Sequence, residues 1–323
     1  MTSKSTRRLL SAVGAAASLL VAAPREARAC GSCRGPGGAG AALTAPWQRW
    51  GVSMAQSVRV GYGITNADAK YRAFGAQSFD TVLDVVGAAA MRPVSPIELG
   101  ASAAFGNVLV GGPSFRSSRR ALGDLSLRAR YEALQEPPLE LTGQSRLPSV
   151  GLTLTTRLPT GPVDRASDSG SGGPSPGTVG STATSQGLGT TEVAFAVDVR
   201  KTFATRYQIG VVGEAAVRAA DSSIGLRRAL GPRGLVRAMG IVFLGDATLS
   251  AFADLAAEGA VSYGGRTSEG SGQRAFALGA SGTLKLDSRL RSGVALSVQP
   301  PLSGLSVNAV TATAITVFLG FTK

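Results

Sequence analysis

The ionisable side chains of this sequence alternate with other residues along several segments. Arg128, Arg130 and Glu132 occupy every second position, and Asp198 and Arg200 repeat the pattern farther along. Such groups could bind ions or polar ligands, or act as general acids and bases. The sequence contains no histidine, which excludes Ser-His-Asp and Cys-His catalysis and imidazole metal sites. We therefore predict a protein that is not an enzyme, with no catalytic residue, cofactor or metal site.

Cys30 and Cys33 are the only cysteines in the sequence. Their C-x-x-C spacing permits a local disulfide in an oxidising compartment, although so short a loop would be strained. Cys30 could instead carry a lipid, the pair could hold a soft metal ion, or both thiols could be free. A disulfide and a lipid are the main candidates, and the residues alone leave all four alternatives open.

The alternating charges belong to segments in which apolar residues fill the intervening positions. In 147–158 the apolar face lies opposite a face that carries Arg157, and in 191–203 it lies opposite Asp198 and Arg200. A period of two predicts β-strands with one apolar and one polar face.

Twelve such segments follow Trp47. They are 50–62, 77–90, 96–107, 122–133, 147–158, 191–203, 206–219, 234–244, 246–258, 273–285, 289–299 and 306–321. An even number of long strands, joined alternately by short turns and long Gly/Ser/Pro-rich loops, is typical of an outer-membrane barrel. The connection 134–146 is longer than this pattern expects. We predict an all-β fold, a transmembrane antiparallel up-and-down β-barrel of about 12 strands.

In this barrel the apolar faces contact outer-membrane lipid and the charged faces line the lumen. The side chains expected at the lumen or its mouth are Arg128, Arg130, Glu132, Arg157, Thr160, Asp198, Arg200, Glu214, Asp254 and Glu258. The other charged residues expected in the lumen are Arg59, Arg218, Arg237, Lys285, Arg289, Arg291, Asp80, Asp84, Glu98, Asp124 and Glu192. The predicted set holds ten basic and ten acidic side chains. Because an ion-selective porin would show an excess of one sign, the balance predicts ion pairs that brace a narrow interior.

Aromatic residues near the strand ends predict two interfacial girdles. At the periplasmic ends these are Trp47, Trp50, Tyr131, Phe203, Tyr207, Phe243, Phe318 and Phe321, and at the outer ends Tyr62, Phe79, Phe105, Phe195, Tyr263 and Phe276.

The N-terminus has the layout of a cleaved secretory signal. A basic start, an apolar stretch from Leu9 to Ala23 and an A-x-A motif before Cys30 predict a signal peptide over 1–29. A flexible segment with the C-x-x-C motif then occupies 30–46, and the barrel 47–323. Cleavage lowers the formal charge from +13 to +9, and no basic stripe interleaved with aromatics indicates nucleic-acid binding.

Three stretches resemble a known family. They are 123–131 (GDLSLRARY), 150–161 (VGLTLTTRLPTG) and 187–200 (GLGTTEVAFAVDVR), and together they cover about a third of the mature chain. They resemble the outer-membrane transporter-like barrels grouped with phenol-degradation meta-pathway proteins. The resemblance implies an outer-membrane barrel whose cargo is a small hydrophobic or aromatic compound.

We therefore expect an outer-membrane protein that passes a small molecule passively. The alternatives are an envelope barrel with a purely structural role, a periplasmic β-sandwich that binds ligands, and a hydrolase built on luminal carboxylates. The residues name neither the cargo nor the oligomeric state, and they do not show whether the lumen is open.

Overall fold

The computed structural model describes residues 48–75, 78–112, 115–136, 147–161, 189–204, 206–223 and 226–323. The predicted signal peptide and the segment with Cys30 and Cys33 lie outside these residues.

No helix in the described part of the chain is long and apolar enough to cross a membrane.

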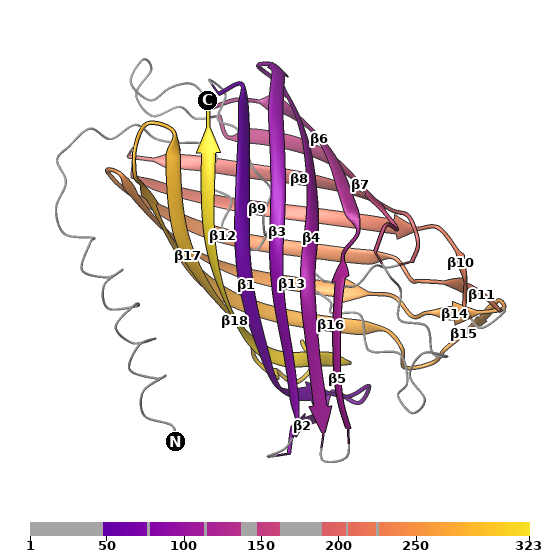
Figure 1. Cartoon of the computed structure of the whole chain (residues 1–323). Coiled ribbons are helices and arrows are strands. Elements are labelled where there is room, and N and C mark those ends of the chain that lie inside the picture. Colours follow the sequence, from indigo (N-terminus) through magenta and orange to yellow (C-terminus); the bar gives the residue numbers. More distant parts are fainter. Residues whose placement is uncertain are drawn as a thin grey trace, which may run out of the picture.

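Twelve antiparallel strands form a closed barrel (Figure 1). They are β1 (Trp50–Thr65), β3 (Phe79–Val94), β4 (Ile97–Gly112), β6 (Leu125–Leu134), β7 (Ser149–Leu158), β8 (Glu192–Phe203), β9 (Tyr207–Arg218), β12 (Arg233–Leu244), β13 (Ala247–Glu258), β16 (Gln273–Lys285), β17 (Leu290–Gln299) and β18 (Ala309–Thr322). Each wall strand pairs with the next along the chain, and β18 pairs with β1 to close the ring. Closure satisfies the backbone hydrogen bonds that an open sheet edge would leave exposed to lipid. The predicted fold class is confirmed.

The two ends of the barrel differ in their connections. At one end, which we call the turn end, β3 and β4 are joined by two residues, and β12 and β13 meet at Gly245, whose φ of +67° suits a glycine in a tight turn. The chain termini of the barrel also meet there, since the Arg49 amide donates to the Lys323 carbonyl at 2.7 Å. The opposite end, the loop end, carries most of the longer connections.

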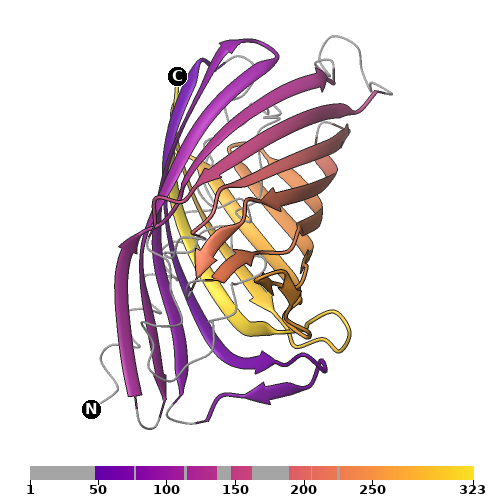
Figure 2. The same ribbon diagram turned by 90° about the vertical axis from the view of Figure 1, so that its right-hand side faces the viewer.

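Six short strands at the loop end were not predicted. Four of them form a separate small sheet beyond the barrel (Figures 1 and 2). A fifth extends β4 as a hairpin before the chain bends into β6, and a sixth pairs with the end of β1. They are β10 (Asp221–Ser223), β11 (Leu226–Ala229), β14 (Ser262–Tyr263), β15 (Arg266–Thr267), β5 (Phe115–Leu122) and β2 (Tyr71–Ala73).

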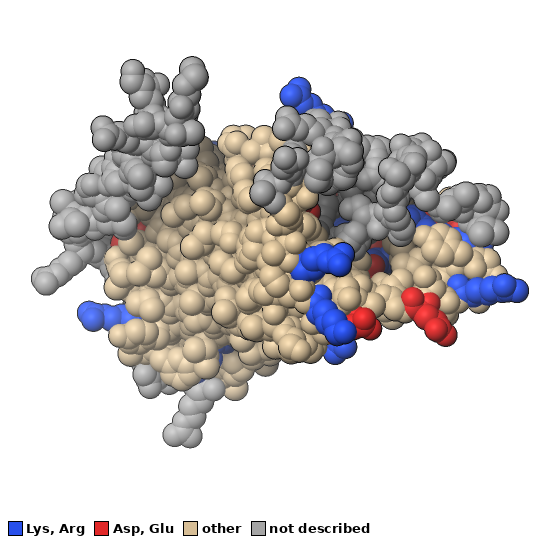
Figure 3. All heavy atoms as spheres, turned by 90° about the horizontal axis from the view of Figure 1, so that it is seen from below, with Lys and Arg blue, Asp and Glu red and all other residues tan. Residues whose placement is uncertain are grey.

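The two faces of the wall have opposite chemistry. On the outer face Met54 and Val317 are more than half exposed, whereas the inward carboxylates of Glu98 and Asp198 are almost fully buried. Figure 3 shows much of the outer wall as an uncharged surface, with most visible charges toward one end. A soluble protein buries its apolar side chains instead, so this arrangement is that of a barrel whose outer face meets lipid.

The predicted aromatic girdles are correct only in part. Trp50 is exposed on the outer face and lies 5.5 Å from the Phe321 ring, and similarly exposed positions are Tyr62, Phe105, Tyr131, Phe195, Phe203 and Tyr207. Phe243 and Phe318 instead face the lumen. Each lies an even number of residues from the inward-facing side chains of its strand. Tyr263 lies in the small sheet. Trp47 and the Phe79 side chain fall outside what the structure describes.

Candidate functional site

Ion pairs line the inner wall on one side of the barrel. Those near the turn end connect β3, β4, β6 and β8, and we call them the turn-side network. Its members are Arg92, Glu98, Arg128, Arg130, Glu132, Asp198 and Arg200. Glu98 is 2.7 Å from Arg128 and 3.5 Å from Arg92, so one carboxylate holds two guanidinium groups. Every charge in this network has an opposite charge within 4 Å, which offsets the cost of removing it from water.

One ion pair of the turn-side network passes over a glycine. Arg130 on β6 lies 3.1 Å from Asp198 on β8, although β7 runs between these two strands. Gly151 is the β7 residue between them, and a Cβ placed there would approach the Arg130 guanidinium to 2.3 Å and the Asp198 carboxylate to 2.4 Å. The missing side chain at Gly151 is therefore what allows the ion pair to form.

A second group of ion pairs, the loop-side network, lies near the opposite end. Its members are Arg157, Glu192, Glu214, Arg218, Arg233 and Glu258. Glu192 is its centre, because its carboxylate accepts from Arg218 at 2.7 Å and from Arg233 at 3.0 Å. Arg233 also donates to Glu214 at 2.6 Å, and Arg218 pairs with Glu258. Charges contributed by five strands thus neutralise one another at this level.

An inward apolar cluster lies toward the turn end of β12 and β13. The inward side chains of Met239, Ile241 and Phe243 on β12 pack with Phe252 on β13. Next to this cluster Arg237 donates to Asp254 through both ends of its guanidinium, at 2.6 and 2.5 Å, and lies 4.9 Å from the centre of the Phe252 ring. The inner wall therefore offers apolar surface whose neighbouring charges are already paired.

The opposite inner wall is made largely of small residues. Ala55, Ala275, Ala295 and Ala312 face inward from β1, β16, β17 and β18 and are almost fully buried. In Figure 1 the strands β1 and β18 lie in front and β8 and β9 behind. The lumen thus has a charged, neutralised wall facing a wall of small side chains. On the second wall Arg59 lies 3.5 Å from Asp80 and also interacts with the buried Asp84.

The structure places most of the predicted luminal residues in these networks. Arg128, Arg130, Glu132, Arg157, Asp198, Arg200, Glu214, Asp254 and Glu258 all take part in ion pairs with inward-facing partners. Thr160 instead ties β6 to β7 at the loop end, since its hydroxyl accepts from the Leu125 amide at 2.9 Å. Lys285 and Arg289 are exposed at the turn end. Whether any of these residues touches cargo stays a prediction.

Two luminal arginines were missing from the predicted set. Arg92 was assigned to a turn and Arg233 to a loop, because the strands were predicted to end or begin one or two residues away. Their parity was an available signal: Arg92 is an even number of residues from Asp84, and Arg233 from Arg237.

The described residues contain no group of three or more His, Cys, Asp or Glu side chains placed to hold a metal ion. The predicted absence of a cofactor stays a prediction.

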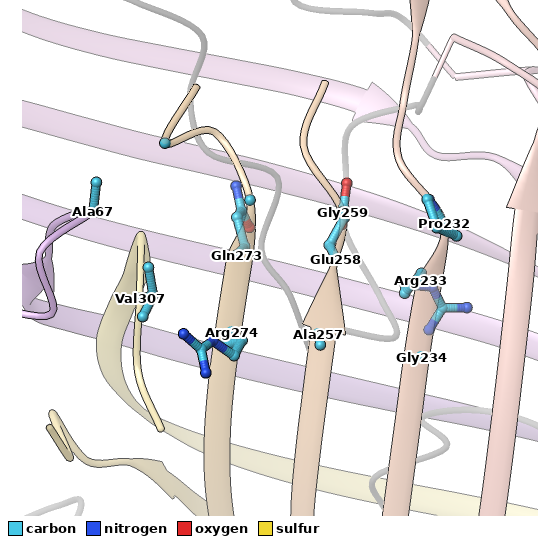
Figure 4. Close-up of a pocket in the computed structure, with 12 residues that line it drawn as sticks. Ala67, Pro232, Arg233, Gly234, Ala257, Glu258, Gly259, Gln273, Arg274 and Val307 are labelled. Carbon is cyan, nitrogen blue, oxygen red and sulfur yellow. The ribbon is translucent and has the colours of Figure 1, made fainter. Parts of the chain in front are cut away.

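A cavity of about 520 Å³ opens at the loop end, at the ends of β12, β13 and β16 (Figure 4). Small residues such as Ala67, Gly234 and Gly272 form much of its lining. Arg233, Glu258, Arg274 and Gln273 are its polar residues. The loop-side network therefore borders this cavity.

The solved structure of the COG4313 outer membrane channel from Pseudomonas putida F1 is similar to this chain along almost its whole length. It covers 88% of this chain and 98% of its own, with a TM-score of 0.68 at 13% sequence identity. The chain has the fold of an outer-membrane β-barrel.

Two porins are more distant. The NanC porin has a TM-score of 0.43 at 9% identity, covering 82% of this chain and 98% of its own. The KdgM porin, solved with disordered oligogalacturonate, has a TM-score of 0.43 at 7% identity, covering 84% and 98%. Neither adds to the fold assignment. No family model and no curated protein matches the sequence, so the grouping with phenol-degradation meta-pathway proteins stays a prediction.

Proposed function

We propose that this protein is an outer-membrane channel through which small, uncharged and largely apolar molecules pass without energy input. The observation that carries the proposal is the pairing of the luminal charges, together with an inward apolar cluster. Arg237, for example, is held by Asp254 beside the Phe252 ring. An interior with little unpaired charge has no strong preference for cations or anions. The rest of its inner surface consists of apolar and small side chains.

The same proposal places the protein in the outer membrane after cleavage of residues 1–29. The loop end then faces the outside and the turn end the periplasm, because barrels of this kind have short periplasmic turns and longer outer loops. The paired carboxylates support a role other than catalysis, since a general acid or base needs a pKa matched to the reaction.

Flux through purified protein in liposomes tests the proposal. A gradient of KCl should give a reversal potential near zero, and uncharged solutes should permeate faster than charged solutes of the same size. A strong preference for one ion would contradict the neutral lumen. Folding is checked in parallel by the heat-dependent gel mobility of the barrel.

A barrel with a purely structural role is the second candidate. The bracing of β6, β7 and β8 through Arg130 and Asp198 favours it, because ion pairs across strands stiffen a wall whether or not anything passes. Folded protein that admits no solute of any class would support this role and refute the channel.

A further inference from the structure

Three exposed basic residues lie together at the turn end, where β1 and β18 close the barrel (Figure 1, beside the label C). Lys323 exchanges backbone hydrogen bonds with Trp50, at 2.9 and 3.1 Å, and its carbonyl also accepts from the Arg49 amide. On the other side of β18 the Thr322 amide donates to the Arg289 carbonyl at 2.9 Å. Arg49, Lys323 and Arg289 thus lie one residue beyond the ends of β1, β18 and β17, and all three are exposed. We call them the seam cations.

The acidic groups beside the seam cations do not balance them. Asp287 is shared, since the charges of both Arg289 and Lys285 act on it. Among the residues that the structure describes, the side chains of Arg49 and Lys323 form no ion pair. Even with the terminal carboxylate at Lys323 counted, an anionic group that approaches the seam meets an excess of positive charge.

An apolar strip of the outer wall leads away from the seam cations. Trp50 and Phe321 begin it, with their ring centres 5.5 Å apart. Val52, Met54 and Leu319 continue it along the two paired strands, and all three are exposed. Aromatic side chains of a spanning protein lie at the level of the lipid headgroups. The seam cations, which lie farther out than this ring pair, are therefore at the level of the lipid phosphates.

A phospholipid fits both parts of this surface. Guanidinium and ammonium groups bind phosphate oxygens through charge-assisted hydrogen bonds, and an acyl chain would cover the apolar strip. A soluble anion or an acidic soluble protein would use the cations and leave the strip uncovered.

We propose that the seam binds an anionic phospholipid, with its headgroup on Arg49, Arg289 and Lys323 and an acyl chain along Trp50 and Phe321. The inference rests on the proposed placement in the outer membrane and goes beyond the channel function, because it assigns a lipid site on the outside of the barrel. A lipid bound there bridges the first and last strands of the wall at the point where the ring closes.

The tryptophans of the sequence report on this site. They are Trp47 and Trp50, so Trp50 is the single tryptophan in a Trp47→Phe background. This background protein is reconstituted in phosphatidylcholine vesicles that contain a minor fraction of lipid with brominated acyl chains. The brominated lipid is either anionic phosphatidylglycerol or zwitterionic phosphatidylcholine. Bromine quenches the fluorescence of a tryptophan that its chain contacts, so the two titrations compare the two headgroups at the seam.

The expected preference follows from the number of cations. Each Lys or Arg near an anionic lipid surface contributes about 1 kcal/mol, or about 5-fold in binding. The background protein should therefore bind the anionic lipid at least about 5-fold better than the zwitterionic lipid. The triple variant Arg49→Gln/Arg289→Gln/Lys323→Gln should bind the two about equally. Arg206→Gln is the matched control and should keep the preference, because Arg206 is an exposed turn-end arginine beside the exposed Tyr207, but between β8 and β9.

The outcomes separate the lipid site from the channel. Equal quenching by both brominated lipids in the background protein, or a headgroup preference that survives in the triple variant, overturns the lipid site and leaves the channel, whose solute flux is measured separately. A headgroup preference without solute flux keeps the lipid site and removes the channel. Absence of quenching by either lipid in correctly folded protein, as shown by gel mobility before and after heating, overturns both the lipid site and the placement of this wall in the membrane.

Discussion

Removing the Asp198 carboxylate should strongly destabilise the barrel. Asp198 lies 3.1 Å from Arg130 and 2.9 Å from Arg200, and all three side chains are almost fully buried. In Asp198→Ala, Glu132 stays as the acidic partner of Arg130, at 2.6 Å. Because Glu132 also pairs with Arg92 at 3.3 Å and interacts with Arg200, one carboxylate would then serve three buried guanidinium groups.

The expected loss follows from the burial of these arginines. Taking one partner from a buried ion pair typically costs about 3–5 kcal/mol, because the other charge is left without compensation in a low-dielectric environment. Asp198→Asn keeps the volume and most contacts but removes the charge, so it should cause most of the same loss. If packing dominated, Asn would behave like the parent.

Unfolding by guanidinium chloride in detergent micelles, followed by tryptophan fluorescence, measures the difference. Gel mobility before and after heating shows that each variant starts from the folded barrel. A free energy of unfolding within about 1 kcal/mol of the parent for Asp198→Ala would refute the conclusion that the turn-side network is buried and mutually compensating.

Three further changes follow from the same geometry. Gly151→Val should destabilise the barrel by an amount comparable to Asp198→Ala, because the valine side chain would occupy the space between Arg130 and Asp198. Gly87→Ala is the control, since nothing lies within 4 Å of its added Cβ. Similar unfolding midpoints for the two variants would contradict this role of Gly151. Gly279→Ala should push the Phe252 ring off the wall, because the added Cβ would lie 2.2 Å from it, and should slow solute flux in liposomes; unchanged flux would show that this ring does not border the pathway. The pKa of Asp287 is lowered by hydrogen bonds from the Arg289 and Leu290 amides. The stabilisation that the Asp287 carboxylate gives is therefore present above its unfolded pKa of about 3.9 and is lost as the pH falls through the lower folded pKa. Unfolding midpoints measured between pH 2 and 6 should depend less on pH in Asp287→Asn than in the parent, and identical profiles would contradict this.

The wall strands were predictable because lipid and lumen impose opposite demands on successive residues. In β8 the pattern is almost free of exceptions, with buried Glu192, Asp198 and Arg200 alternating with exposed or half-buried apolar side chains. β12 alternates less clearly in sequence, since its inward face carries Met239 and Ile241. Phe243 was assigned to the girdle because it lies near the end of this strand, and the apolar inward face gave no sign that the ring points into the lumen.

The short strands of the loop end lack such a pattern. β14 and β15 have two residues each, too few to display a period, and β11 pairs with β14 although more than thirty positions separate them. Their hydrogen bonds depend on how two loops meet in space, which local sequence does not encode.

The ion-pair partners were equally inaccessible to sequence, although the luminal parity was not. Arg130 binds Asp198 on a strand that is not its neighbour because Gly151 leaves room between them. A glycine at that position also fits an ordinary weak point in a strand, so its role appears only once the register of three strands is known.

The seam between β1 and β18 has a consequence for how the barrel is assembled. Each other pair of wall strands joins neighbours along the chain, whereas this one joins Gly51 to Thr322. During synthesis β1 appears first, and its seam partner is the last strand made. Until residues 309–322 are available, the incomplete sheet has two open edges, each a template for pairing with another chain. The fourteen residues of β18 thus convert an aggregation-prone intermediate into a closed ring, and a chain that lacks them cannot finish folding.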